Sequence, residues 1–261
     1  MVHGIRQSAQ WAAELCGGRQ SGRRGAYKLR HVAPAENHLI ALLPRRDRLL
    51  LLAACELVQL DLGAMLCAPG EPTRHVYFPR DCFISLVTAV EGEAGLEVGM
   101  VGREGMMGAQ LALGVSSIPL HGLVQGAGAA WRIAAAPFRR VLSGSKALQL
   151  SLNRYVYVLM AQLATSAACT RFHRVEPRLA RWLLMTQDRA HSDSFHLTHE
   201  LLAHMLGVRR VGITGAASHL QRCGLIRYRR GEITVLDRAG LEAAACSCYV
   251  ADRRTYDATL G

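Results

Sequence analysis

Residues 146–173 contain neither glycine nor proline, the two residues that most often interrupt a helix. Within this stretch the positions 152, 156, 159, 163, 166, 170 and 173 are spaced alternately four and three apart, as along one face of a helix. They hold Leu, Val, Leu, Leu, Ser, Thr and His in turn. The spacing predicts one long helix over 144–174, with a face that packs either on a second copy of the chain or on its own domain.

The part of the chain before this helix has the pattern of short strands. After two short helical runs around Pro44, seven apolar or alternating runs cover 56–62, 64–67, 75–78, 84–90, 96–101, 122–125 and 130–133. Turn residues separate them, as in Pro69-Gly70-Glu71-Pro72 and Glu91-Gly92-Glu93. The pattern predicts an antiparallel, jelly-roll-like β-roll over 35–143.

The part after it has the pattern of a helix-turn-helix. Thr198 is a suitable N-cap for a short apolar helix, and Gly207 follows where a left-handed turn residue is needed. A second helix begins near Arg209 and ends at Cys223-Gly224, and two strands then flank a tight Arg230-Gly231 turn. This order predicts a winged helix-turn-helix over 175–250, in which the second helix enters a DNA major groove. The overall fold class is therefore α+β, with residues 251–261 as a tail.

The charge distribution fits either a polyanionic partner or basic residues that only keep the protein soluble. The chain carries 31 basic and 20 acidic side chains, a formal net charge of +11. The net charge is +5 over 1–34, −1 over 35–140, +2 over 141–169 and +5 over 170–261, so the roll is nearly neutral and both ends are basic. Residues 1–34 are rich in Gly, Arg and Ser and are expected to be a flexible basic extension. We expect no membrane span and no secretory signal, and hence a cytoplasmic protein.

The eight cysteines are scattered, and the only close pair is Cys246-Ser247-Cys248. This pattern predicts reduced, mostly buried thiols, with no metal site and no cofactor. His199 and His204 resemble a zinc-protease pair, but a spacing of five places them on different sides of a helix. No nucleophile, base and orienting group occur at an interpretable spacing, so the chain is not expected to be an enzyme.

Two further segments complete a resemblance to the Crp/Fnr family of bacterial transcription regulators. Residues 69–79, from Pro69 to Pro79, are similar to the family's turn after its third strand, and residues 97–108, from Glu97 to Gly108, are similar to the stretch leading into its ligand cassette. The resemblance covers about residues 37–240. It implies a β-roll effector domain of the cyclic-nucleotide-binding type, a dimerisation helix and a winged helix that binds double-stranded DNA. The implied partners are a second copy of the chain, RNA polymerase and an unknown small-molecule effector.

The ligand cassette departs from the family pattern. Cyclic-nucleotide-binding relatives carry a Gly-Glu for the ribose and an arginine about ten residues later for the phosphate. Here no arginine occurs between Arg103 and Arg132. A buried phosphate without a cation is costly, so the chain is not expected to respond to cyclic AMP or cyclic GMP. The effector-pocket positions implied by the resemblance are Glu104, Gly105, Met106, Met107 and Gly108.

The second helix of the helix-turn-helix also departs from the family pattern. The family's base-contacting Arg, Glu and second Arg align with Arg210, Val211 and Gly215. Valine cannot accept a hydrogen bond from cytosine, so the half-site read must differ from the family's common one. The DNA-contacting residues expected from the motif are Thr198, Arg209, Arg210, Thr214, Ser218, Arg227, Arg229 and Arg230. The alternative function is a ligand- or partner-sensing module whose winged helix contacts protein and binds DNA weakly or not at all.

Overall fold

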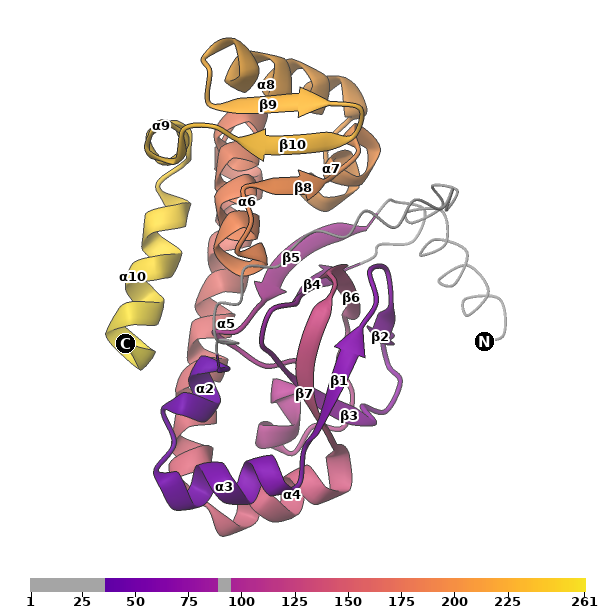
Figure 1. The fold of residues 1–261 in the computed structure, drawn as a ribbon, viewed down its shortest axis with the longest axis vertical. Helices are drawn as coiled ribbons and strands as arrows, with labels where there is room; N and C mark the ends of the chain where they lie inside the picture. Colours follow the sequence, from indigo (N-terminus) through magenta and orange to yellow (C-terminus); the bar gives the residue numbers. More distant parts are fainter. Residues whose placement is uncertain (1–35, 89–94) are drawn as a thin grey trace.

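The computed structural model describes residues 36–88 and 95–261, and a long helix, α5 (Lys146–Phe172), joins its two parts (Figure 1). A roll of strands lies beside α5, and a smaller mixed domain lies beyond the C-terminal end of that helix. The expected basic extension over 1–34 falls outside the described residues. No helix in the described ranges combines the length and apolar character needed to cross a bilayer.

The N-terminal part is an antiparallel roll, which confirms the expected fold class. One sheet has the order β1-β7-β3 and the other β2-β6-β4-β5, and Tyr77, Leu86 and Val124 are among the side chains of the core between them. The helices around the roll are α2 (His38–Ala41), α3 (Arg45–Ala53), η1 (Ala109–Leu113) and α4 (Ala135–Gly144). The strands are β1 (Glu56–Leu60), β2 (Met65–Cys67), β3 (His75–Pro79), β4 (Phe83–Thr88), β5 (Leu96–Val101), β6 (His121–Gly126) and β7 (Gly128–Ala134).

The long helix forms where the absence of glycine and proline predicts it. Ser145 caps its start, because its hydroxyl oxygen accepts a hydrogen bond from the Leu148 N–H at 3.1 Å. On the face marked by the sequence, Leu152 is fully buried, and Val156 packs beside it on the roll. The first half of that face is therefore used within the subunit. The exposed apolar side chains of α5 include Tyr157 and Met160, which are 59% and 63% exposed.

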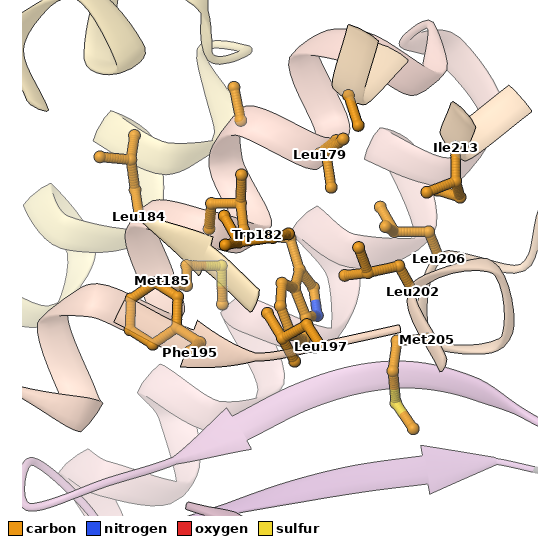
Figure 2. Close-up of a cluster of buried hydrophobic side chains, with 14 of the residues drawn as sticks. Leu179, Trp182, Leu184, Met185, Phe195, Leu197, Leu202, Met205, Leu206 and Ile213 are labelled. Atoms are coloured by element: carbon orange, nitrogen blue, oxygen red, sulfur yellow. The ribbon is translucent and has the colours of Figure 1, made fainter. Parts of the chain in front are cut away.

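The C-terminal part is a winged helix-turn-helix. Its elements are α6 (Val175–Ala190), β8 (Ser194–His196), α7 (His199–Leu206), α8 (Arg210–Arg222), β9 (Ile226–Arg229), β10 (Glu232–Val235) and α9 (Arg238–Ala244). The strand β8, which the sequence pattern does not predict, adds to the two wing strands in the order β8-β10-β9. Figure 2 shows Trp182 of α6 in the middle of the apolar core of this domain, and the side chain of Met205 directed toward the strands of the roll.

Residues 248–260 form a helix, α10 (Cys248–Leu260), that lies along α5 (Figure 1). This differs from the expected tail over 251–261, and the expected domain boundary at 250 falls inside the helix. Leu260 is buried in the core at the base of the roll, which also contains Phe78 and Phe138. Asp252 pairs with Arg181 of α6 at 2.6 Å, so α10 connects both parts of the molecule.

The roll and the winged helix also touch directly. The Trp182 indole N–H of α6 donates to Glu97 Oε1 of β5 at 2.8 Å, and the Ser85 hydroxyl of β4 donates to the other oxygen of that carboxyl group. Near the end of β5, Glu104 pairs with Arg189 of α6 at 2.7 Å. Hydrogen bonds and ion pairs thus position the winged helix against the roll.

Candidate nucleic-acid interface

The turn between α7 and α8 has the geometry that the motif requires. The Thr198 hydroxyl oxygen accepts a hydrogen bond from the Leu201 N–H at 3.1 Å and so caps α7. Gly207 ends that helix with a φ of 60°, in the left-handed region that favours glycine. Arg209 is the N-cap residue of α8 in an extended conformation, and the two helices meet as predicted.

One face of α8 is buried and the other is open. Ile213, Ala216, Ala217 and Leu220 pack into the domain core. Arg210, Thr214 and Ser218 are spaced four residues apart and are all exposed, so they form a row on the outer side of the helix. Val211, at the start of the same helix, is 75% exposed. The structure therefore places the expected reading residues together on one accessible surface.

The hydroxyl of Thr214 joins this row to α7 and to the wing. It donates to the Arg210 carbonyl at 3.1 Å and lies 3.1 Å from His199 Nδ1. The His199 ring stacks on Tyr228 of β9, with centroids 4.3 Å apart. Burial, and then the charge of Arg210, lower the pKa of His199, so its ring is neutral at pH 7. In the sequence this histidine stands out only as half of a zinc-protease-like pair that its spacing excludes, and its contact with Tyr228 has no sequence signal.

The wing places its arginines at an exposed edge. Arg230 and Gly231 both have positive φ, 52° and 81°, as a two-residue type I′ hairpin turn requires. Arg227 and Arg229 alternate with Tyr228 along β9, so they project from the opposite face of the sheet. Together with His196, Glu232 and Thr234 these three arginines line an open hollow.

The positive charge of this surface is not neutralised locally. The five arginines expected at DNA are Arg209, Arg210, Arg227, Arg229 and Arg230, and all are exposed. Among the described residues none of the five forms an ion pair with a carboxylate. Guanidinium groups in this state are available to phosphate oxygens and to guanine edges.

The expected effector cassette is mostly filled by its own side chains. Met106 is fully buried in the core at the base of the roll, and Met107 is buried between the sheets. A Cβ atom on Gly105 would clash with the Tyr155 hydroxyl, so this glycine allows α5 to approach closely. Gly108 adopts a φ of 96° before η1. Of the five expected residues, Glu104 lines a cavity.

That cavity lies between the end of β5 and the helices α5, α6 and α10, and has a volume of about 210 Å³. Its wall is both apolar and charged, with Tyr155 and Tyr256 beside Glu104 and Arg189. Burial raises the pKa of both tyrosine hydroxyls, which are therefore neutral hydrogen-bonding groups. The sequence does not predict this cavity, because one of its walls is α10, which covers residues where the sequence predicts a tail.

The cysteines are less scattered in space than in sequence. Cys169 near the end of α5 lies close to Cys246 and Cys248 in the connection to α10, and all three are buried. Their scatter in the sequence does not extend to the fold, because α10 folds back along α5.

Comparison with known proteins agrees with this geometry. A family model described as the Crp-like helix-turn-helix domain matches residues 177–244. A regulator of the Crp/Fnr family from Eubacterium rectale ATCC 33656 superposes with a TM-score of 0.63 and 17% identity, over 80% of this chain and 99% of that one. FixK2 from Bradyrhizobium japonicum gives a TM-score of 0.63 and 12% identity, over 74% and 98%.

A Crp/Fnr-family transcriptional regulator from Thermus thermophilus gives a TM-score of 0.60 and 21% identity, over 73% of this chain and 98% of that one. A comparison with curated protein sequences gives no match. The superpositions cover 98–99% of these three solved structures. The chain therefore carries a Crp-like helix-turn-helix domain on the fold of the Crp/Fnr family of transcription regulators.

Proposed function

We propose that the chain is a homodimeric transcription regulator that binds double-stranded DNA through α8 and the wing. The observation that carries this proposal is the open row on α8 beside five exposed arginines, none of which pairs with a carboxylate of residues 36–88 or 95–261. In this arrangement the N-terminal end of α8 enters the major groove. Arg209 and Arg210 approach the bases there, and Thr214 lies one turn further along.

Contacts with the DNA backbone come from the other residues that the motif predicts to touch DNA. Ser218 stands at the far end of the row on α8 and Thr198 at the start of α7, and Arg227, Arg229 and Arg230 extend this surface along the wing toward phosphate groups. The exposed Val211 offers an apolar surface in place of a hydrogen-bond acceptor. A thymine methyl group is its natural contact, so the preferred half-site differs from that of relatives with a glutamate at this position.

Homodimerisation is part of the proposal, because a two-fold symmetric DNA site is bound by two copies of α8. The exposed Tyr157 and Met160 of α5 provide an apolar surface for a second copy. RNA polymerase remains a predicted partner.

The control of DNA binding is proposed not to depend on cyclic nucleotides. Met106 and Met107 are buried in the cores of the roll, and the sequence has no arginine between Arg103 and Arg132 to pair with a cyclic phosphate. A small-molecule effector would enter the cavity beside Glu104 and Arg189 instead, where one ligand can touch both the roll and α6.

The proposal is tested by selection from a random duplex library at low salt. We expect enrichment of a palindromic site. Arg210→Ala should lose about 1–3 kcal/mol of discrimination at one base position. Arg229→Ala should weaken binding to all sequences alike and reduce the salt slope by about 1. Recovery of no palindrome would overturn the proposal, and equal effects of both variants on every sequence would refute the division of roles.

The cavity favours one second candidate, a sensing module whose winged helix contacts a protein. This function predicts that any association with nucleic acid has a salt slope close to zero, since few counterions would be released. A steep slope in the same titration supports the DNA-binding function.

A further inference from the structure

A cluster of metal-ligating side chains lies where the end of α5 meets the connection between α9 and α10. It consists of three thiols and one imidazole, from Cys169, His173, Cys246 and Cys248. The four ligand atoms all lie within 4.8 Å of one another. Cys169 Sγ is 3.5 Å from Cys246 Sγ, and Cys248 Sγ is 3.5 Å from His173 Nδ1.

These separations match the edges of a tetrahedron around one metal ion. With Zn–S bonds of about 2.3 Å and a Zn–N bond of about 2.0–2.1 Å, two sulfurs lie about 3.8 Å apart and a sulfur and a nitrogen about 3.6 Å apart. An iron–sulfur cluster would hold its cysteine sulfurs further apart, since several metal atoms stand between them. Three thiolates and one imidazole also form a common ligand set of structural zinc sites.

Helix geometry brings the ligands together. Cys169 and His173 are four residues apart, so they lie one above the other on the same side of the last turn of α5. Cys246 and Cys248 flank Ser247, the N-cap residue of α10, and are directed to the same point by the turn before that helix. Three of the four side chains are buried, so water competes little for the ligand positions.

The electrostatic setting suits bound thiolates. Zn²⁺ with three thiolates and a neutral imidazole carries one net negative charge. The buried guanidinium group of Arg178 interacts with Cys169 and Cys246 and offsets that charge, while the nearby Arg181 is already paired with Asp252.

We propose that Cys169, His173, Cys246 and Cys248 bind one Zn²⁺ ion in tetrahedral geometry. The site ties the C-terminal turn of α5 to the segment that follows the winged helix. His173 is the C-cap residue of α5 and Arg174 is the N-cap residue of α6, so the metal sits at the junction between the long helix and the DNA-binding domain. Bound zinc would hold that junction in one orientation.

The test uses the full-length chain, purified under reducing conditions and depleted of metal with a chelator. Titration with Zn²⁺ should end at one ion per chain by mass spectrometry of the metal content, and it should raise the melting temperature. Co²⁺ in place of Zn²⁺ should give the intense visible absorption bands of a tetrahedral site with thiolate ligands.

Variants identify the ligands. Cys246→Ser and Cys248→Ser should lose both the bound metal and the cobalt bands, and the exposed Cys223→Ser serves as the matched control that keeps them. If a variant does not fold, the melting temperature of the unmodified chain with and without Zn²⁺ still shows whether the chain binds zinc. Weak octahedral cobalt bands, iron bound in preference to zinc, or formation of a Cys169–Cys246 disulfide in place of zinc binding under the reducing conditions would each overturn the proposal.

Discussion

At the scale of single residues, Glu97 has an environment that differs strongly from water. It is a buried carboxyl group between the roll and α6, and it accepts hydrogen bonds from Trp182 and Ser85. Burial raises its pKa from 4.5 to about 7, although both hydrogen bonds and the charges of Arg189 and Arg181 act in the opposite direction. Near neutral pH this carboxyl group is thus only partly ionised.

The raised pKa predicts how stability depends on pH. Between pH 4.5 and about 7 the folded chain keeps a proton on Glu97 that the unfolded chain has lost, so stability falls as pH rises through this window. The total loss from this group is on the order of 3 kcal/mol. Glu97→Gln should remove this dependence, because the amide accepts from Trp182 and donates to Ser85 without ionising.

Urea unfolding between pH 4 and pH 8 measures the effect. The exposed Glu71→Gln is the matched control and should keep the slope of the unmodified chain. If Glu97→Gln shows the same fall in stability as Glu71→Gln, the pH dependence originates in another group.

At the scale of elements, the sequence predicts the long helix, the strands of the roll and the wing, but not β8 or α10. The run without glycine or proline at 146–173 corresponds to α5 almost residue for residue. The three-residue strand β8 leaves no such pattern, and only its pairing with β10 defines it. In α10 the apolar positions 249, 256 and 260 do follow a helical spacing, but the charged residues between them resemble a solvated tail.

The helix α10 contributes to the core, and this leads to a prediction. Leu260 is 4% exposed and packs into the core at the base of the roll. Leu260→Ala should cost about 2 kcal/mol of unfolding free energy, the lower end of the range for a buried leucine, because it lies near the chain end. Val250→Ala, on the exposed side of the same helix, should change stability by less than about 0.5 kcal/mol.

Chemical denaturation of both variants gives the comparison. Equal stabilities for the two would mean that α10 does not hold its place along α5 in solution. The zinc site would then lose the support of the element that carries Cys248.

At the scale of the whole molecule, the parts of the candidate site that depend on local sequence could be predicted. Thr198, Gly207 and the Arg230-Gly231 turn have the local geometry that their residue types require. Features that depend on long-range contacts could not be predicted. Cys169 and Cys248 are close only because α10 returns along α5, and the cavity beside Glu104 closes for the same reason. No spacing of residues in the sequence indicates that α10 folds back along α5.

Assembly of two chains gives the last prediction. Met160 is 63% exposed on α5, and a charge there would have to be buried in a dimer that pairs these helices. Met160→Glu should therefore yield a monomer in analytical ultracentrifugation. Its affinity for a palindromic site should fall by about a hundredfold or more, since the second reading helix no longer binds in the same complex.

Leu236→Glu is the control and should leave the dimer intact. Leu236 is 51% exposed and lies in the loop between β10 and α9. Both variants should bind a single half-site with equal affinity, because neither residue belongs to the reading row on α8. A dimeric Met160→Glu chain would mean that another surface joins the subunits, and the proposed pairing along α5 would be wrong. A monomer that still binds the palindrome at full strength would instead separate DNA recognition from dimerisation.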